Sequence, residues 1–346
     1  MSLTRIDGVR IAGVTTCVPP RSVDNNEYGK TFGVNEVRKV VAMAGVRRRH
    51  VVEPNVTSAD LCFEAAAALL ARLDWAPDTI TGLILITQSP DYFLPSSSCV
   101  VHKWLGLSDQ CATFDLGLGC SGYPYGLYLA ATMLRAGGQQ RILVLHGDTP
   151  SRFTSPDDHA TTLLFGDAGS ASAIEASPDA APSFFCLHTD GKGYRGLIIQ
   201  GGGFRDRFPA NPRHQMLEMD GAGVFQFTIA RVPPLVRDSL AFAGLAAADI
   251  DWYAFHQSNR FMMQHLIKKC GLPEERVPLV IDRFGNSGGP SVPLAMTQGL
   301  PLVGRADARV MMVGYGVGLS WGSAIVRLDG NTPLDHILYS GEVTRG

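Results

Sequence analysis

Short runs of apolar residues recur along the chain and alternate with longer segments that have one apolar face. Residues 82–87 and 141–148 are nearly continuous apolar runs, which is typical of strands covered on both faces. In residues 58–73, apolar side chains recur at every fourth position, which predicts an amphipathic helix. The alternation of buried strands with such helices predicts an α/β fold in which helices and mixed sheets form layers.

The predicted elements occur in the same order twice. The first series has strands at residues 82–87, 141–148 and 170–175, and the second has strands at residues 250–255, 310–313 and 322–328. In each series a glycine-flanked polar residue, Cys120 or Asn286, stands directly before a helix. This order predicts two similar halves related by a pseudo-twofold axis. Residues 1–177 form the half with Cys120, and residues 178–346 form a crossover segment and the half with His256 and Asn286.

Cys120 lies between an apolar run and a helix predicted for residues 121–135, with Gly119 and Gly122 on either side. Glycines allow a substrate or a neighbouring backbone to come close. A sulfur at the start of a helix faces unpaired N–H groups and the positive end of the helix dipole, and both favour the thiolate. The segment is therefore interpreted as a nucleophile site, with a buried structural cysteine as an equally good alternative.

Composition narrows the possible partners. A formal charge of −2 over 346 residues gives no electrostatic basis for binding nucleic acid. Seven scattered cysteines favour reduced thiols in the cytoplasm, and no Cys/His spacing is typical of a metal site. The chain has neither the apolar run of a signal peptide at residue 1 nor one long enough to span a membrane, so we expect no membrane association.

Two further polar residues follow predicted strands in the second half. His256 comes directly after the strand at residues 250–255, and Asn286 lies in a glycine-rich loop before a helix that begins near Ser291. In α/β folds, polar residues at the carboxyl ends of strands commonly carry the chemistry. A single histidine or asparagine has an ordinary structural explanation, but Cys120, His256 and Asn286 at related places together predict one shared site.

With these residues identified, the chain resembles β-ketoacyl-acyl-carrier-protein synthase III, of the thiolase-like condensing-enzyme superfamily, over about residues 9–328. The motifs that carry the resemblance are Gly119-Cys120-Ser121-Gly122, Phe165-Gly166-Asp167-Ala168-Gly169, His256-Gln257-Ser258-Asn259, Gly285-Asn286-Ser287 and Gly316-Val317-Gly318-Leu319-Ser320-Trp321-Gly322. The resemblance implies a thiolase-like fold, with αβαβα layers and mixed five-stranded sheets, in a homodimer.

The resemblance also implies a reaction. Cys120 accepts an acyl group from a thioester, and the backbone N–H groups of Cys120 and Val317 hold the acyl carbonyl. His256 and Asn286 then bind the thioester carbonyl of a malonyl-carrier protein and stabilise the enolate formed as carbon dioxide leaves. Attack on the acyl-cysteine gives a β-ketoacyl product. No bound cofactor is implied, since thioesters of CoA or phosphopantetheine are the substrates.

Further positions bear on the partners and the acyl donor. Leu94 matches a residue that crosses the family's dimer interface to cap the acyl pocket of the other subunit. Arg260 adjoins a position that helps to dock the acyl-carrier protein. Family members that use acetyl-CoA hold its adenine between a tryptophan and an arginine, and the matching positions here are Lys39 and His159. The donor is therefore expected to be another acyl-CoA or an acyl-carrier protein.

Two alternatives share the fold but not the reaction. One is an acyltransferase that moves the acyl group to an alcohol or an amine without decarboxylation. The other is a non-catalytic partner subunit that shapes the pocket of another condensing enzyme. The presence of all three expected side chains favours the condensing enzyme.

Overall fold

The computed structural model describes residues 2–301 and 307–346. The α-helices are α1 (Gly29–Phe32), α2 (Val34–Ala44), α3 (Ser58–Leu73), α4 (Ser97–Trp104), α5 (Gly122–Ala136), α6 (His159–Thr162), α7 (Gly221–Ala243), α8 (Arg260–Cys270), α9 (Ile281–Phe284) and α10 (Ser291–Gly299). The strands are β1 (Ser2–Ile6), β2 (Val9–Val18), β3 (Ser22–Asp24), β4 (Arg48–His50), β5 (Gly82–Ile86), β6 (Ala112–Leu116), β7 (Arg141–Asp148), β8 (Ala168–Ala176), β9 (Ser183–Thr189), β10 (Leu197–Ile198), β11 (Glu218–Met219), β12 (Trp252–Phe255), β13 (Asp307–Gly316), β14 (Ser320–Asp329) and β15 (Leu334–Leu338).

Two large mixed sheets carry the fold. One has the strand order β1-β9-β14-β13-β12 and the other the order β15-β2-β8-β7-β5-β6. Within them, β2-β8-β7-β5 corresponds to β9-β14-β13-β12. In each set the last two strands are parallel and the other neighbours are antiparallel. The predicted duplication is therefore present in the strand order.

The second sheet differs from the expectation of five strands, because β6 adds a sixth at its edge. Within the described residues, the other half has no equivalent strand before Asn286. There the Gln257 side chain donates to the Pro278 carbonyl oxygen at 3.2 Å and accepts the Val280 N–H at 3.0 Å. The Gln257 side chain is thus bonded to backbone groups of this segment, and Pro278 has no N–H to offer to a strand.

The terminal strands cross between the halves. β1 pairs antiparallel with β9 in the sheet of the second half, and β15 pairs parallel with β2 in the sheet of the first. The division at residues 177 and 178 stays a prediction. Its two parts are interleaved by these exchanged strands.

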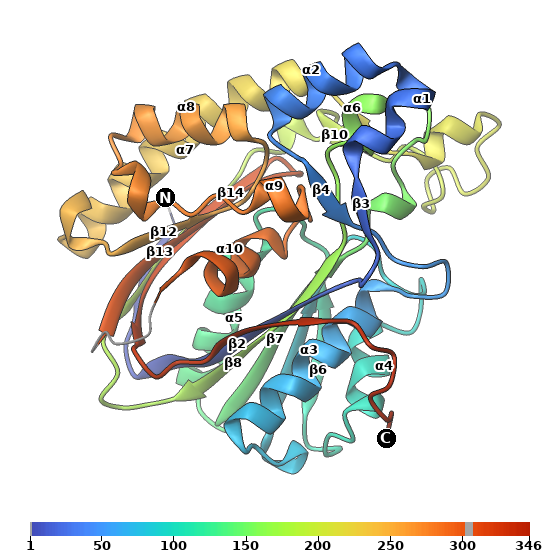
Figure 1. Ribbon diagram of the computed structural model, residues 1–346. Helices are drawn as coiled ribbons and strands as arrows, with labels where there is room; N and C mark the ends of the chain where they lie inside the picture. Colours follow the sequence, from blue (N-terminus) through green and yellow to red (C-terminus); the bar gives the residue numbers. More distant parts are fainter. Residues whose placement is uncertain (1, 302–306) are drawn as a thin grey trace.

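The layers follow the predicted αβαβα order (Figure 1). α3 packs on the outer face of the six-stranded sheet, with α4 beside it, and α7 covers the outer face of the five-stranded sheet, with α8 against it. α5 and α10 lie between the two sheets and contact strands of both. β5 is buried along its whole length, as its continuous apolar run predicts. The two central helices thus begin inside the molecule, where Cys120 and Asn286 precede them.

Candidate active site

Cys120 lies just before α5, in the tight connection that follows β6. The backbone of Gly316, near the end of β13, closes over it. A Cβ atom at Gly316 would lie 2.8 Å from the Cβ and 3.1 Å from the Sγ of Cys120, and the φ angle there is +153°. Only glycine leaves room for the sulfur at this position.

The surroundings of the Cys120 sulfur favour the thiol, whereas its place before the helix is expected to favour the thiolate. Burial raises the pKa of Cys120 to about 12, and the nearby Asp148 carboxylate adds to the rise. The backbone N–H groups of Val317 and of Cys120 itself act in the opposite direction and lower the pKa. The loss of hydration destabilises the thiolate by more than these two N–H groups stabilise it, so the pKa rises.

His256 follows β12, and its backbone N–H donates to the Val313 carbonyl oxygen of β13. The imidazole is 2% exposed, and burial lowers its pKa to about 4, so the ring is neutral at pH 7. Its Nδ1 lies 2.7 Å from the Oγ of Ser291, which accepts the N–H of Gln257 at 3.2 Å. The hydroxyl hydrogen of Ser291 is then free to bond Nδ1, which favours the tautomer that carries its hydrogen on Nε2.

The carboxamide of Asn286 is oriented by two backbone groups. Its Oδ1 accepts the N–H of Gly288 at 3.0 Å, and its Nδ2 donates to the Ser258 carbonyl oxygen at 3.3 Å. These bonds identify which end of the amide is the donor, and they leave the second N–H of Nδ2 for a ligand. Asn286 is only 5% exposed, so a bond to that hydrogen forms away from bulk water.

The side chains of Cys120, His256 and Asn286 all line one cavity. The prediction that they share a site therefore agrees with the geometry. Most of the remaining lining is apolar, and it comprises Pro150, Phe153, Leu164, Phe165, Leu197, Leu217, Met219, Val224, Met262 and Val317. A neutral imidazole, a carboxamide and a thiol in such surroundings can bind and polarise a carbonyl group better than they could in water.

Comparisons with known proteins identify the family of this chain. The family models "3-Oxoacyl-[acyl-carrier-protein (ACP)] synthase III" and "3-Oxoacyl-[acyl-carrier-protein (ACP)] synthase III C terminal" match residues 114–193 and 240–328. A putative 3-oxoacyl-[acyl-carrier-protein] synthase 3 of Campylobacter jejuni is 30% identical, with 98% of this chain and 99% of the relative covered. This chain belongs to the 3-oxoacyl-[acyl-carrier-protein] synthase III family. The expectation of a condensing acyltransferase is thereby confirmed at the level of the family.

Solved structures of this synthase family share the whole fold. The 3-oxoacyl-(acyl-carrier protein) synthase of Burkholderia xenovorans LB400 has a TM-score of 0.93 and 41% identity, covering 97% of this chain and 98% of that one. The 3-oxoacyl-(acyl carrier protein) synthase III of Pseudomonas aeruginosa PAO1 has a TM-score of 0.83 and 27% identity, covering 93% and 98%. The thiolase-like α/β fold is thus confirmed.

The other predicted residues lie around the site at different distances. Val317 lines the cavity, and its backbone N–H, like that of Cys120, lowers the pKa of the Cys120 thiol. Leu94 is 80% exposed and lies outside the cavity lining. Arg260 begins α8 and packs over Gly45 at the end of α2. The roles assigned to all of these residues stay predictions.

The two positions that match the adenine clamp share a single partner. Lys39 lies 3.4 Å and His159 lies 3.8 Å from the Glu36 carboxylate. His159 also packs edge-on against Phe32. These contacts differ from a tryptophan and arginine pair open to a flat base.

Two lining residues and one buried neighbour escaped the sequence analysis. Asp148 and Gln88 line the cavity, and His146 lies buried next to Asp148. Their signal was present, because Asp148 ends a buried strand, as the residue before His256 does. The same argument from strand ends that selected His256 applies to Asp148.

Within residues 2–301 and 307–346, no helix has the length and apolar character needed to cross a membrane. The same residues contain no group of three or more histidine, cysteine or acidic side chains that could hold a metal ion.

Proposed function

We propose that this chain transfers an acyl group from a thioester to Cys120 and condenses it with a malonyl group on an acyl-carrier protein. In the first step the Cys120 sulfur bonds to the acyl carbon, and the donor's C–S bond breaks. The proton lost by Cys120 balances the one gained by the departing thiol. In the second step malonyl-S-carrier, acyl-S-Cys120 and one proton give β-ketoacyl-S-carrier, carbon dioxide and the free Cys120 thiol.

The first step uses the backbone around Cys120. The backbone N–H groups of Cys120 and Val317 lower the pKa of the thiol, which supports the proposal that the same pair receives the oxygen of the acyl carbonyl. Because burial raises the pKa of the free thiol, we propose that the thiolate forms as the thioester arrives. The apolar lining keeps water away from the acyl-cysteine, which would otherwise hydrolyse.

The second step uses the donors of the other half. When the malonyl carboxylate leaves as carbon dioxide, its electron pair forms an enolate whose oxygen needs hydrogen-bond donors. His256 offers Nε2–H, and Asn286 offers the free hydrogen on Nδ2. The enolate carbon then attacks the acyl carbonyl on Cys120, and the sulfur leaves. Neutral donors suit this task because they do not transfer a proton to the enolate and end the reaction early.

The observation that carries the proposal is the convergence of Cys120, His256 and Asn286 in one apolar cavity. The test incubates the purified chain with a series of acyl-CoA and acyl-carrier thioesters, followed by malonyl-carrier protein. We expect an acyl adduct on Cys120 by intact mass, release of carbon dioxide and a β-ketoacyl product. An adduct without carbon dioxide would instead indicate simple acyl transfer, and no adduct would indicate a non-catalytic subunit.

The proposal includes the donor and the partners. A donor other than acetyl-CoA fits the Glu36 contacts of Lys39 and His159 and the largely apolar cavity. Arg260, at the surface beside α2, is proposed to meet the acidic face of a carrier protein. The test is the donor series above, in which acetyl-CoA should be the slowest.

We also propose that the chain works as a homodimer in the cytoplasm, with no cofactor beyond its thioester substrates. The adjacent side chains of Tyr92, Phe93 and Leu94 are all more than half exposed, and such an apolar patch suits a subunit interface. The seven cysteines are all free, in keeping with a reducing compartment. The Leu94→Asp variant should dissociate the dimer in light scattering and slow the turnover.

A further inference from the structure

Asp148 and His146 form a buried polar pair beside the cavity that the proposed reaction does not use. Both lie at the end of β7, at 2% and 0% exposure. The Nε2 of His146 is 4.0 Å from Oδ2 of Asp148, and neither ring nitrogen of His146 has a hydrogen-bond partner among the described residues. Burial lowers the pKa of His146 to about 3, so the pair carries at most one charge, that of Asp148, near pH 7. A carboxylate at this depth requires a structural or chemical reason.

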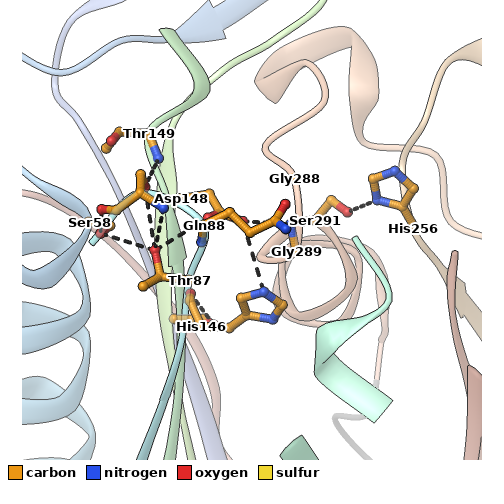
Figure 2. Close-up of polar contacts among 12 residues, drawn as sticks. Ser58, Thr87, Gln88, His146, Asp148, Thr149, His256, Gly288, Gly289 and Ser291 are labelled. Carbon is orange, nitrogen blue, oxygen red and sulfur yellow. Dashed lines mark hydrogen bonds and ion pairs between the residues drawn. The ribbon is translucent and has the colours of Figure 1, made fainter. Parts of the chain in front are cut away.

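The Asp148 carboxylate joins the two halves of the molecule. Its Oδ1 accepts the backbone N–H of Gln88 at 2.8 Å, on the loop after β5 of the first half. Its Oδ2 accepts the N–H of Gly289 at 3.2 Å, in the turn before α10 of the second half. Figure 2 shows these contacts, together with a longer one in which the Thr87 hydroxyl donates to Asp148 Oδ1 at 3.4 Å. Both oxygens are therefore engaged by backbone donors from different halves.

The turn that Asp148 holds is the one that orients Asn286. The N–H of Gly288 donates to Asn286 Oδ1, and the next N–H, that of Gly289, donates to Asp148. Gly288 has a φ angle of +67°, and a Cβ there would lie 2.8 Å from Asp148 Oδ2. A Cβ at Gly289 would lie 1.7 Å from Nε2 of His146. Gly288 therefore packs directly against Asp148, and Gly289 packs directly against His146.

We propose that Asp148 is a positioning residue for the decarboxylative step, since it holds the Gly288–Gly289 turn that aims the Asn286 carboxamide. The inference rests on the proposed function. Asp148 acts through Asn286 and not on the substrate. His146 packs against Gly289 so closely that a side chain on Gly289 would collide with the imidazole. Acyl transfer to Cys120 does not use Asn286, so the two steps should depend on Asp148 differently.

The Asp148→Asn variant separates the steps. A carboxylate accepts at both oxygens, whereas a carboxamide accepts at one end and donates at the other. In the variant, either the Gln88 or the Gly289 N–H therefore faces another donor, and the turn loses its fixed place. Displacement of a catalytic group by about 1 Å costs on the order of 100-fold in rate. The variant also removes the charge that raises the pKa of Cys120, so the thiol becomes easier to ionise.

The experiment measures both steps in single turnover, with an acyl-CoA that acylates the wild type and with malonyl-carrier protein. In Asp148→Asn we expect carbon dioxide release to fall about 10- to 100-fold. Acylation of Cys120 should be unchanged or faster, and iodoacetamide should alkylate Cys120 at a lower pH than in the wild type. Opposite effects on the two steps distinguish positioning of Asn286 from general destabilisation.

Glu64→Gln is the matched control. Glu64 is 3% exposed, and its two carboxylate oxygens accept the backbone N–H groups of Ser340 and Gly341, far from the cavity lining. This variant loses the same kind of clamp at a different place, so it should lower thermal stability without separating the steps. An equal loss of both steps in Asp148→Asn would overturn the proposal. Absence of both adduct and carbon dioxide in the wild type would instead count against the proposed function.

A measurement on the wild type serves if the variant does not fold. Burial raises the pKa of Asp148 to about 7, so protonation below that pH replaces one acceptor by a donor. Carbon dioxide release should fall as the pH is lowered from about 8 to about 6, that is, from about one unit above the pKa of Asp148 to about one unit below it. The rate of Cys120 acylation should not fall over the same range. A release rate that is flat over this range would contradict the proposal.

The other ionisable groups near Asp148 are His146 on β7, His256, Asp167, Cys120 and Cys62. Burial lowers the pKa of His146 to about 3 and that of His256 to about 4, and burial raises the pKa of both thiols, so these groups stay neutral across the transition. Asp167 has a raised pKa through burial, and its carboxylate is held by Ser151 and Val52. The Asp167→Asn variant should keep the wild-type transition in carbon dioxide release.

Discussion

The parallel pairs β5–β7 and β12–β13 end in the same register in the two halves, but with different side chains at equivalent positions. The registers pair the last residue of β5 with His146 and the last residue of β12 with Val313. Two residues further along, β7 carries Asp148 and β13 carries Tyr315, so these side chains hold equivalent positions. Both line the cavity.

Each of the two side chains fastens the loop that follows the neighbouring parallel strand. Asp148 accepts the N–H of Gln88, whereas the hydroxyl of Tyr315 donates to the His256 carbonyl oxygen at 3.2 Å and bonds the Ser258 hydroxyl at 3.0 Å. Burial raises the pKa of Tyr315 above its ordinary value, so the phenol is always neutral. The duplicated fold thus places a side chain that holds the neighbouring loop at the same position in both halves, and we call Asp148 and Tyr315 the two clamps. The residue type decides whether each clamp responds to pH.

The largest effect should come from the nucleophile of the first half. Cys120→Ala should abolish the covalent adduct and lower condensation by about 10⁴-fold or more, since no group replaces the sulfur. Intact mass and product assays measure both. Carbon dioxide release from malonyl-carrier protein should survive in part, because its donors belong to the second half. Complete loss of that release would show that the halves do not divide the chemistry.

The donor of the second half should give the converse result. Asn286→Ala removes one donor from the enolate oxygen and should lower carbon dioxide release by about 100- to 1,000-fold. The Cys120 adduct should still form at a rate within about threefold of the wild type, since the carboxamide is not used in acyl transfer. Rapid-quench mass spectrometry gives that rate. A comparable loss in acylation would contradict the division.

The two clamps should differ in their pH response. Tyr315→Phe removes the bonds to His256 and Ser258 and should destabilise the fold by about 1–3 kcal/mol, because buried polar groups lose their partner. Its remaining carbon dioxide release should keep the wild-type transition near pH 7. Asp148→Asn should lose that transition. Thermal unfolding and pH–rate profiles compare the two, and a shared profile would remove the distinction between the clamps.

The smallest effect should appear in stability alone. The folded-state pKa of Asp148 is raised to about 7, above the ordinary value for an unfolded chain. Between these two values the folded state binds one more proton, so stability rises as pH falls, by at most about 1.4 kcal/mol per unit. Denaturant unfolding should show this slope in the wild type and a smaller one in Asp148→Asn. Equal slopes would place the titration on another group.

The local pattern of the chain was enough to predict much of this molecule. The apolar runs at β5 and β7 predicted strands covered on both faces, and the repeated order of elements predicted the duplicated sheets. The motifs around Cys120, His256 and Asn286 predicted one site, because strand ends and helix starts meet at the same place in α/β folds. Such features depend on residues close together in sequence.

The remaining features depend on contacts between distant segments. The sixth strand pairs only at the edge of the sheet of the first half, and at the corresponding place in the second half Gln257 contacts Pro278 and Val280. The pKa of the Cys120 thiol is raised because the surrounding layers exclude water from the sulfur and hold Asp148 nearby. The role inferred for Asp148 depends on a turn about 140 residues away in the chain.

The sequence by itself determined the strands, the helices and the three side chains that the site contains, since periodicity and strand ends are local properties. The tertiary structure decided the pKa values of these side chains and the direction in which their donor groups point. Burial and hydrogen bonding are set by whatever the fold packs against a group, and no stretch of sequence near that group specifies it.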